Sequence, residues 1–337
     1  MKILLLQLKR IGDLILTVPA ITAVRKNFPA ANITLVVGHG SRELLPAIAG
    51  VDRALVARGR VSDAAQWLTL AASKFDYSID FSRSDRSAFL TLLSGAKTRI
   101  TYDTIRRQPL RQLSYNEFVP SRVRFVHTID HHLALLAPLG VHDASPEIQL
   151  ALPTAAKRKA AALVAEHDLG ENLLIIHPGS ARAEKFWVAR RWAEVADAMT
   201  RQNLSVVLTG GNSRLERQHI GRIKKHMKEP ATDLSGQLDL LTLAALIERA
   251  RLLATIDSAP MHLAGALGTP QVALFGLTNP FHWRPLSAPV SIVQGGQKGP
   301  LRNFVPKQIP RQMKEISTEQ VIDAMQSLLS KPAASVA

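Results

Sequence analysis

The sequence predicts an α/β protein built from two successive doubly wound domains, each a parallel sheet covered by helices. Short, continuously apolar runs alternate with helical patterns, which is typical of strands buried on both faces of a parallel sheet. This alternation occurs twice along 337 residues, a length that accommodates two domains. None of the apolar runs approaches the roughly 20 residues that a membrane-spanning helix needs.

In the first half, apolar runs predict strands and a spacing near 3.6 residues predicts helices. The expected strands are 3–8, 33–37 and 77–81, and the expected helices are 14–27 and 130–139. A charge-rich segment, 97–124, shows no clear periodicity. Residues 146–153 begin and end with proline and are expected to form a linker, so the first domain is expected to cover 1–150.

The second half repeats this plan and is expected to form a domain over 151–316. Its expected strands are 173–176, 205–209, 252–256 and 271–275, and its expected helices are 155–167, 191–201, 214–228, 240–249, 260–267 and 318–329. In doubly wound sheets ligands bind beyond the carboxyl ends of the strands. A cleft between the two domains is therefore the expected main site.

Charge is the most informative feature of the composition. The net charge is +15 and the isoelectric point is near 10.4, which predicts an anionic partner: nucleic acid, an anionic membrane face or a phosphorylated substrate. Aromatic residues make up only 5%, so stacking platforms for single-stranded nucleic acid are scarce. The absence of cysteine excludes disulfides, thiol catalysis and cysteine-ligated zinc. The N-terminus lacks secretory features, which favours the cytoplasm.

Asp13 follows the first expected strand, one residue after Gly12. A carboxylate at the carboxyl end of a strand can deprotonate a hydroxyl in a transfer reaction. The alternative is that Asp13 caps the next helix, a position that aspartate favours. Its position alone favours the cap.

Two loops of the second half could contact a nucleotide. Ser180 ends the turn after strand 173–176, and Lys185 follows it, so backbone N–H groups and a point charge could bind phosphate there. Thr209 and Gly210 end the next strand, and Glu216 on the following helix could bind ribose hydroxyls. The alternatives are ordinary turns and a solvated surface carboxylate.

The segment from Asp257 to His262 is the strongest candidate. A strand ends at residue 256, and Pro260 stands near the start of the next helix, where proline is preferred. The N–H groups of Ser258 and Ala259 would therefore form a site for a diphosphate, with His262 within reach. A capped helix with a packed histidine remains an equal alternative.

The basic residues of segment 97–124 could face an anionic acceptor, because with a net charge of +15 they are expected to lack nearby acidic partners; the alternative is a solvated face. They are Lys97, Arg99, Arg106, Arg107, Arg111, Arg122 and Arg124. His127, His131 and His132 form no recognisable metal pattern, so no metal site is expected.

Taken in order, these segments resemble glycosyltransferase family 9, the bacterial ADP-heptose:lipopolysaccharide heptosyltransferases. The resemblance spans roughly residues 1–330, and the ordered set of motifs makes it specific. The motifs are Arg10-Ile11-Gly12-Asp13, Leu93-Ser94-Gly95-Ala96, His177-Pro178-Gly179-Ser180 with Lys185 and Trp187, Leu208-Thr209-Gly210-Gly211, Leu234-Ser235-Gly236, Asp257-Ser258 with Met261-His262-Leu263-Ala264, and Phe275-Gly276.

This resemblance implies the GT-B fold, in which two Rossmann-like domains face a central cleft. It implies that domain 1–150 binds the acceptor and domain 151–316 the nucleotide-sugar, and that the last helix, within 317–330, returns to the N-terminal domain. It also implies transfer with inversion at the anomeric carbon and without a metal or other cofactor.

The resemblance assigns roles residue by residue. Asp13 matches the catalytic base, and Lys185 matches a lysine that offsets charge on the departing ADP. The donor-binding positions are Ser180, Lys185, Thr209, Gly210, Glu216 at the ribose, Leu238 at the adenine, Asp257, Ser258, Ala259 and His262. Ala259 stands where the family commonly has glycine. The residues expected to face the acceptor are Arg10, Arg106, Arg107 and Arg111.

The implied partners are ADP-heptose or a related nucleotide-sugar and the lipopolysaccharide inner core, with no nucleic acid. A phosphorylated lipopolysaccharide acceptor would explain the net positive charge of the chain. The resemblance also implies a cytoplasmic enzyme with peripheral contact to the anionic inner membrane. Two alternatives remain. A GT-B-like nucleotide-sugar epimerase would need further acid and base groups, whereas only Asp13 is well placed. A non-catalytic basic binding protein would leave Asp13 and the Asp257 turn without a role.

Overall fold

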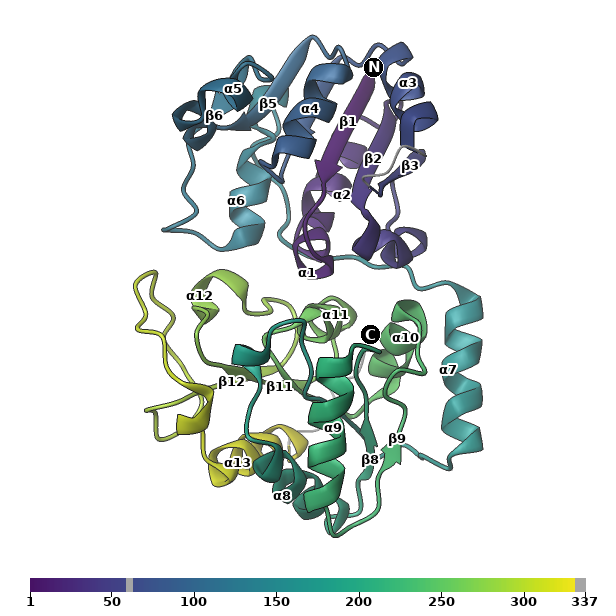
Figure 1. Cartoon of the computed structure of the whole chain (residues 1–337), viewed down its shortest axis with the longest axis vertical. Coiled ribbons are helices and arrows are strands. Elements are labelled where there is room, and N and C mark those ends of the chain that lie inside the picture. The colour runs from purple at the N-terminus through teal and green to yellow at the C-terminus, as the bar shows by residue number, and fades with distance from the viewer. Residues whose placement is uncertain (59–62, 331–337) are drawn as a thin grey trace. The chain divides into compact units, whose positions relative to one another are not determined.

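The protein divides into two compact units in a computed structural model that describes residues 1–58 and 63–330. The first unit is Met1–Ala151 and the second begins at Leu152 (Figure 1). The boundary falls one residue after the one expected from the sequence. Residues 146–153 carry no helix or strand, and the amide of Ala151 donates to the carbonyl of Ala47 at 2.9 Å.

The first unit contains a six-stranded sheet in which every neighbouring pair is parallel. The strand order is β3-β2-β1-β4-β5-β6, which is the doubly wound order. The strands are β1 (Lys2–Gln7), β2 (Asn32–Gly38), β3 (Arg53–Ala57), β4 (Tyr77–Asp80), β5 (Thr98–Tyr102) and β6 (Glu117–Val119).

The helices of the first unit mostly connect successive strands, as parallel pairing requires. The α-helices are α1 (Ile11–Ile15), α2 (Val18–Asn27), α3 (Ala64–Ala72), α4 (Asp85–Leu93), α5 (Pro109–Gln112) and α6 (Thr128–Ala134), and the 3₁₀ helices are η1 (His39–Ala47), η3 (Asp103–Arg107) and η4 (Ala137–Leu139).

One helix expected over 14–27 is broken into α1 and α2. Pro19 lies in the first turn of α2 and has no N–H to continue the hydrogen-bond ladder of a helix. At the break, the hydroxyl of Thr17 donates to the carbonyl of Asp13 at 2.7 Å and lies 3.1 Å from Nδ1 of His132. The break therefore ties the start of the chain to α6.

The second unit repeats the winding of the first, with strand order β12-β11-β10-β7-β8-β9 and parallel pairing. Its strands are β7 (Leu173–His177), β8 (Ser205–Leu208), β9 (Thr232–Asp233), β10 (Leu252–Ile256), β11 (Gln271–Phe275) and β12 (Val290–Gln294). Its helices are α7 (Thr154–Glu166), α8 (Ala189–Thr200), α9 (Arg214–His226), α10 (Leu240–Arg249), α11 (Ala259–Leu267), α12 (Pro280–Trp283) and α13 (Thr318–Leu329), with 3₁₀ helices η5 (Ala183–Lys185) and η6 (Met313–Glu315).

The last helix was expected to return to the first unit. In the structure this helix, α13, belongs to the second unit. Val321, Ala324 and Met325 are fully or almost fully buried in a core that also contains Trp187 and Trp192 of the same unit. This apolar face fixes the helix there, since burying a large apolar side chain contributes about 1.5–3 kcal/mol.

Segment 97–124 is also more ordered than its charge pattern predicts. It forms β5, η3, α5 and β6, and these short elements carry too few apolar residues to show a period. Within the described residues, no helix is long and apolar enough to cross a bilayer.

Candidate functional site

Each sheet reverses its strand order between its first and fourth strands. These switch points lie between β1 and β4 in the first unit and between β7 and β10 in the second. Doubly wound sheets bind ligands there, because the connections leave in opposite directions and open a crevice. The loop that carries Asp13 follows β1, and the loops that carry Ser180 and Asp257 follow β7 and β10. The main predicted residues therefore stand at both switch points.

Asp13 lies in the first turn of α1 and is half-buried. Its Oδ2 accepts the backbone N–H of Arg10 at 3.3 Å, so it satisfies one of the free donors at the start of the helix. Asp13 thus does what the capping alternative proposed, from the third position of the helix and not from the cap. Its other carboxylate oxygen carries no hydrogen bond within the described residues, and that oxygen is available to accept a proton.

A compact polar cluster joins Lys185, Asp257 and Thr278. Lys185 Nζ donates to Asp257 Oδ2 at 2.6 Å and to the Asp257 carbonyl at 3.0 Å, and the hydroxyl of Thr278 donates to the same Oδ2 at 2.6 Å. The side chains of Lys185 and Asp257 are only 15% and 9% exposed. The cluster therefore holds a lysine ammonium in place at the carboxyl end of β10.

Ser258 is the N-cap of α11, and its side chain does not cap the helix. Its hydroxyl instead lies 3.3 Å from that of Thr255. Ala259 is the first helical residue and is not among the residues with positive φ, so glycine is not required there. Pro260 has no N–H, and the amide of Met261 donates to the Ser258 carbonyl at 3.2 Å. The amides of Ser258 and Ala259 are therefore the ones that could meet an anion at this helix N-terminus. His262 is buried within the same helix.

Glu216 is buried and not a solvated surface charge. Its carboxylate accepts the N–H of Gly211 at 3.2 Å and the hydroxyl of Ser213 at 2.9 Å. A Cβ on Gly179 or on Gly211 would come within 2.5 Å of a Glu216 carboxylate oxygen. Both glycines are therefore needed so that the loops after β7 and β8 can close over this carboxylate.

The side chain of Thr209 points into the protein. Its hydroxyl lies 3.0 Å from Nδ1 of His177, and burial lowers the pKa of the His177 ring to about 4. A Cβ on Gly210 would come within 2.5 Å of the side chain of Ile220. The N–H of Thr209 donates to the Ile176 carbonyl, and the Gly210 carbonyl accepts the N–H of Gly236, both at 2.9 Å. The backbone groups left for a ligand are therefore the Thr209 carbonyl and the Gly210 N–H.

Two further predicted positions are less constrained. The hydroxyl of Ser180 accepts the N–H of Arg182 at 3.1 Å and so shapes the turn after β7. Leu238 is half-buried in the loop between β9 and α10. Thr278 belongs to the loop after β11, and its hydrogen bond to Asp257 was not predicted from the sequence.

The basic segment has acidic partners that the sequence analysis did not anticipate. Lys97 pairs with Asp76 at 3.0 Å, and Arg111 pairs with Asp85. Arg106 lies over the ring of Phe118, with 4.3 Å from its guanidinium carbon to the ring centroid. Asp76 precedes β4 and Asp85 begins α4, so proximity in sequence could not show these two acidic partners. Arg106 and Arg107 are exposed.

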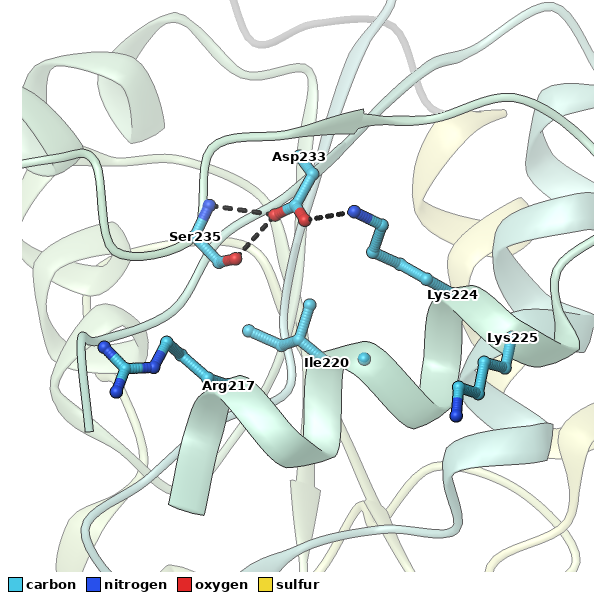
Figure 2. Close-up of a pocket in the computed structure, with 7 residues that line it drawn as sticks. Arg217, Ile220, Lys224, Lys225, Asp233 and Ser235 are labelled. Carbon is cyan, nitrogen blue, oxygen red and sulfur yellow. Dashed lines mark hydrogen bonds and ion pairs between the residues drawn. The ribbon is translucent and has the colours of Figure 1, made fainter. Parts of the chain in front are cut away.

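A surface cavity of about 500 Å³ lies away from both switch points, between α9 and the edge strand β9. Figure 2 shows Lys224 and Ser235 bonded to Asp233, while Arg217 and Lys225 make no contact with it. A second cavity of about 340 Å³ lies on the other side of α9 and includes Phe186. Neither contains a predicted site residue. We place the candidate site at the switch points, because polar groups converge there.

Among residues 1–58 and 63–330, no three His, Asp or Glu side chains gather closely enough to hold a metal ion.

A family model described as "Glycosyltransferase family 9 (heptosyltransferase)" matches residues 64–313, well over half of the chain. The chain belongs to glycosyltransferase family 9. It is therefore an enzyme, a glycosyltransferase, and the alternative of a non-catalytic basic binding protein is wrong.

Named relatives match most of the chain. Lipopolysaccharide heptosyltransferase 3 of Escherichia coli K12 is 26% identical over 336 residues, 96% of this chain and 97% of that protein. A second Escherichia coli protein of the same name is 27% identical over 82% of this chain and 84% of its own. A family 9 crystal structure from Veillonella parvula superposes with a TM-score of 0.84 at 26% identity, covering 97% of both chains.

More distant structures share the fold. The Escherichia coli heptosyltransferase WaaC with ADP-2-deoxy-2-fluoro heptose matches with a TM-score of 0.73 at 19% identity, covering 97% of this chain and 99% of that one. A UDP-GlcNAc 2-epimerase from Methanocaldococcus jannaschii matches at 0.52 and 12% identity, over 99% and 94%. The predicted GT-B fold is confirmed, and membership of family 9 separates this chain from epimerases that share it.

Proposed function

We propose that this protein transfers heptose from ADP-heptose to a hydroxyl of the lipopolysaccharide core, with inversion at the anomeric carbon and without a metal. The proposal is supported by the chain's membership of family 9 together with the polar groups that lie at the switch point of each unit. Curated relatives named lipopolysaccharide heptosyltransferases span nearly the whole chain. One related structure of the fold contains an ADP-heptose analogue. The first unit would bind the acceptor and the second the donor.

The proposed mechanism uses one carboxylate and several positive groups. Asp13 takes the proton of the acceptor hydroxyl as its oxygen attacks the anomeric carbon of heptose. The bond from that carbon to the diphosphate breaks, and ADP leaves with the electron pair. Lys185, the backbone amides of Ser258 and Ala259, and His262 offset the charge that develops on the diphosphate. Glu216 would hold the ribose, and Leu238 would contact the adenine.

The test is a transfer assay with purified protein, ADP-heptose and a lipopolysaccharide acceptor that lacks the added heptose. We expect ADP release only when acceptor is present, a gain of one heptose by mass spectrometry, and the inverted anomer by NMR. A parallel reaction without acceptor addresses the epimerase. Conversion of the donor to an isomer there would contradict the proposal.

We expect transfer to continue undiminished in EDTA, because protein cations supply the charge that a divalent ion otherwise provides. The control is a metal-dependent glycosyltransferase assayed with the same chelator. Loss of activity in EDTA that Mg²⁺ or Mn²⁺ restores would overturn metal independence and leave the transfer reaction standing.

Arg106 and Arg107, exposed near the carboxyl end of β5, are proposed to attract the anionic acceptor or its membrane. Changing both to glutamate should raise acceptor KM about tenfold at low salt, with donor KM unchanged, since exposed charge contacts contribute about 0.2–1 kcal/mol each. The effect should shrink in high salt, because screening reaches about 8 Å at physiological ionic strength.

The matched control reverses two exposed cations of α9, Arg222 and Lys225, and so changes the net charge equally. An equal rise of acceptor KM in this control would show a general charge effect in place of a binding face. A cytoplasmic location with peripheral contact to the inner membrane belongs to the same proposal.

A further inference from the structure

Two cations without ion-pair partners stand on adjoining loops at the β1/β4 switch point of the first unit. Lys9 follows β1 and Arg83 follows β4. Their loops are tied together, because the N–H of Leu8 donates to the hydroxyl of Ser82 at 2.6 Å. Within residues 1–58 and 63–330, neither cation forms an ion pair.

The backbone of Arg83 is held in a conformation that side chains rarely adopt. Its φ is 58°, in the left-handed region where a Cβ is costly. Oδ1 of the buried Asp80 accepts the N–H groups of Ser82 at 2.7 Å and Arg83 at 3.2 Å, and Arg111 donates to the Arg83 carbonyl. Glycine would fit this turn without strain. The arginine at this turn therefore carries a backbone cost that glycine would avoid.

The side chain of Arg83 makes two contacts in the described chain, and most of its N–H groups have no partner there. Its Nη1 donates to the hydroxyl of Thr104 at 3.0 Å, and its guanidinium carbon lies 5.1 Å from the ring centroid of Tyr102. In the described chain these are its side-chain contacts. A guanidinium has five N–H groups in a planar fork that matches an oxyanion, so most of that fork remains free.

His131 supplies an independent sign of a missing ligand. Its ring stacks on that of Tyr102 at 3.8 Å, the side chain is 3% exposed, and neither ring nitrogen has a hydrogen-bond partner in the described residues. Burial, followed by the charges of Arg83 and Lys9, lowers its pKa to about 3, so the ring is neutral. Buried polar atoms are rarely left without partners, and this one lies against the ring that Arg83 covers.

Lys9 links this group to the proposed base. Lys9 as a whole residue is exposed, but its ammonium is partly buried, and this burial lowers the pKa of the ammonium. Asp13 raises that pKa and Arg83 lowers it. Lys9 thus lies within electrostatic reach of both Asp13 and Arg83.

We propose that Lys9 and Arg83, together with His131, form a subsite for a carboxylate or phosphate of the acceptor, beside the hydroxyl that Asp13 deprotonates. The inference rests on the proposed function and adds residues outside segment 97–124 to those that recognise the acceptor's charge. Arg83 acts here as a specificity residue. It holds the acceptor so that one hydroxyl faces the base.

The decisive variant is Arg83→Gly. It removes the guanidinium and relieves the left-handed strain, so the protein should fold with an unchanged or higher Tm. We expect acceptor KM to rise about 10- to 100-fold, the range for a charge-assisted contact, while donor KM stays constant. Arg83→Lys should recover part of the loss. The matched control is Lys74→Gly, at another left-handed residue of the same unit (φ 50°), which should leave the kinetics unchanged.

Altered acceptors distinguish the two sources of the anion. One acceptor has its phosphates removed, and the other has its carboxylates converted to methyl esters. The difference between wild type and Arg83→Gly should vanish on the acceptor that lacks the recognised group. A difference that persists on both, or an Arg83→Gly variant with wild-type acceptor KM, would overturn the subsite. Wild-type turnover in the same assay tests the proposed function separately.

Discussion

Asp13→Asn should fold normally and lose nearly all transfer activity. Removal of a general base costs about 10²–10⁴ in rate, so kcat should fall by that factor. The fold should survive, because an amide oxygen can accept the Arg10 N–H that the carboxylate accepts now. Single-turnover assays with saturating donor and acceptor measure the loss, and thermal unfolding measures the fold.

The control for Asp13→Asn is another acidic residue in the first turn of a helix. Glu319 stands in the first turn of α13 and is exposed. Glu319→Gln should weaken only a solvent-screened interaction with the helix N-terminus and leave kcat unchanged. Donor binding by Asp13→Asn should match wild type, since the proposed donor site lies in the other unit. Near-normal turnover in Asp13→Asn would remove the base assignment.

The sequence was sufficient for strands that are buried on both faces. Leu173 to Ile176 and Leu252 to Ile256 read as continuous apolar runs, and both are strands of the second sheet. Strands near the sheet edges were missed. β3, β5 and β6 include Arg53, Arg99 and Glu117, and a strand exposed on one side lacks the continuous apolar pattern.

The position of the last helix could not be read from its sequence. The pattern of α13 predicted an amphipathic helix correctly, but an apolar stripe does not name its partner. The carbonyl of Ile316 accepts the indole N–H of Trp187 at 3.0 Å, and this contact precedes α13 directly. Only tertiary structure shows that the stripe completes the core of the second unit.

The residues of the candidate site were predictable where they follow strands, but their contacts with one another were not. Lys185 and Asp257 were both identified, because each stands near the carboxyl end of a strand. Their mutual ion pair was not, since 72 residues separate them. Gly179 and Gly211 were identified as parts of the family motifs, whereas their close contact with Glu216 gives them a packing role. Arg83 gave no sequence signal, because left-handed backbone at arginine has none.

The ion pair between Lys185 and Asp257 bears on how a departing diphosphate would be stabilised. In the present structure the Lys185 ammonium is neutralised by a carboxylate 2.6 Å away. A diphosphate that approaches the same ammonium would compete with that carboxylate. Thr278 also donates to Asp257 and would continue to satisfy it if Lys185 turned toward the donor. Lys185 could therefore exchange Asp257 for a diphosphate without leaving the Asp257 carboxylate unpartnered.

Lys185→Met should lower kcat by about 10²–10³ and weaken ADP binding, because loss of one preorganised donor to a developing anion costs that much. It should also lower stability by about 2–3 kcal/mol. Removing one partner of a buried pair typically costs 3–5 kcal/mol, and here both side chains retain some contact with water. Kinetics must therefore be read at a temperature well below the Tm of the variant.

The double variant Lys185→Met with Asp257→Asn separates the two effects. With no unpaired buried charge left, it should regain most of the lost stability and none of the lost kcat. Thermal unfolding, ADP titration and steady-state kinetics on both variants and wild type complete the comparison. A change in donor KM alone, with kcat intact, would make Lys185 a ground-state binder, because an interaction made only in the transition state must appear in kcat. Recovery of kcat together with stability would instead show that Lys185 only keeps the loop folded.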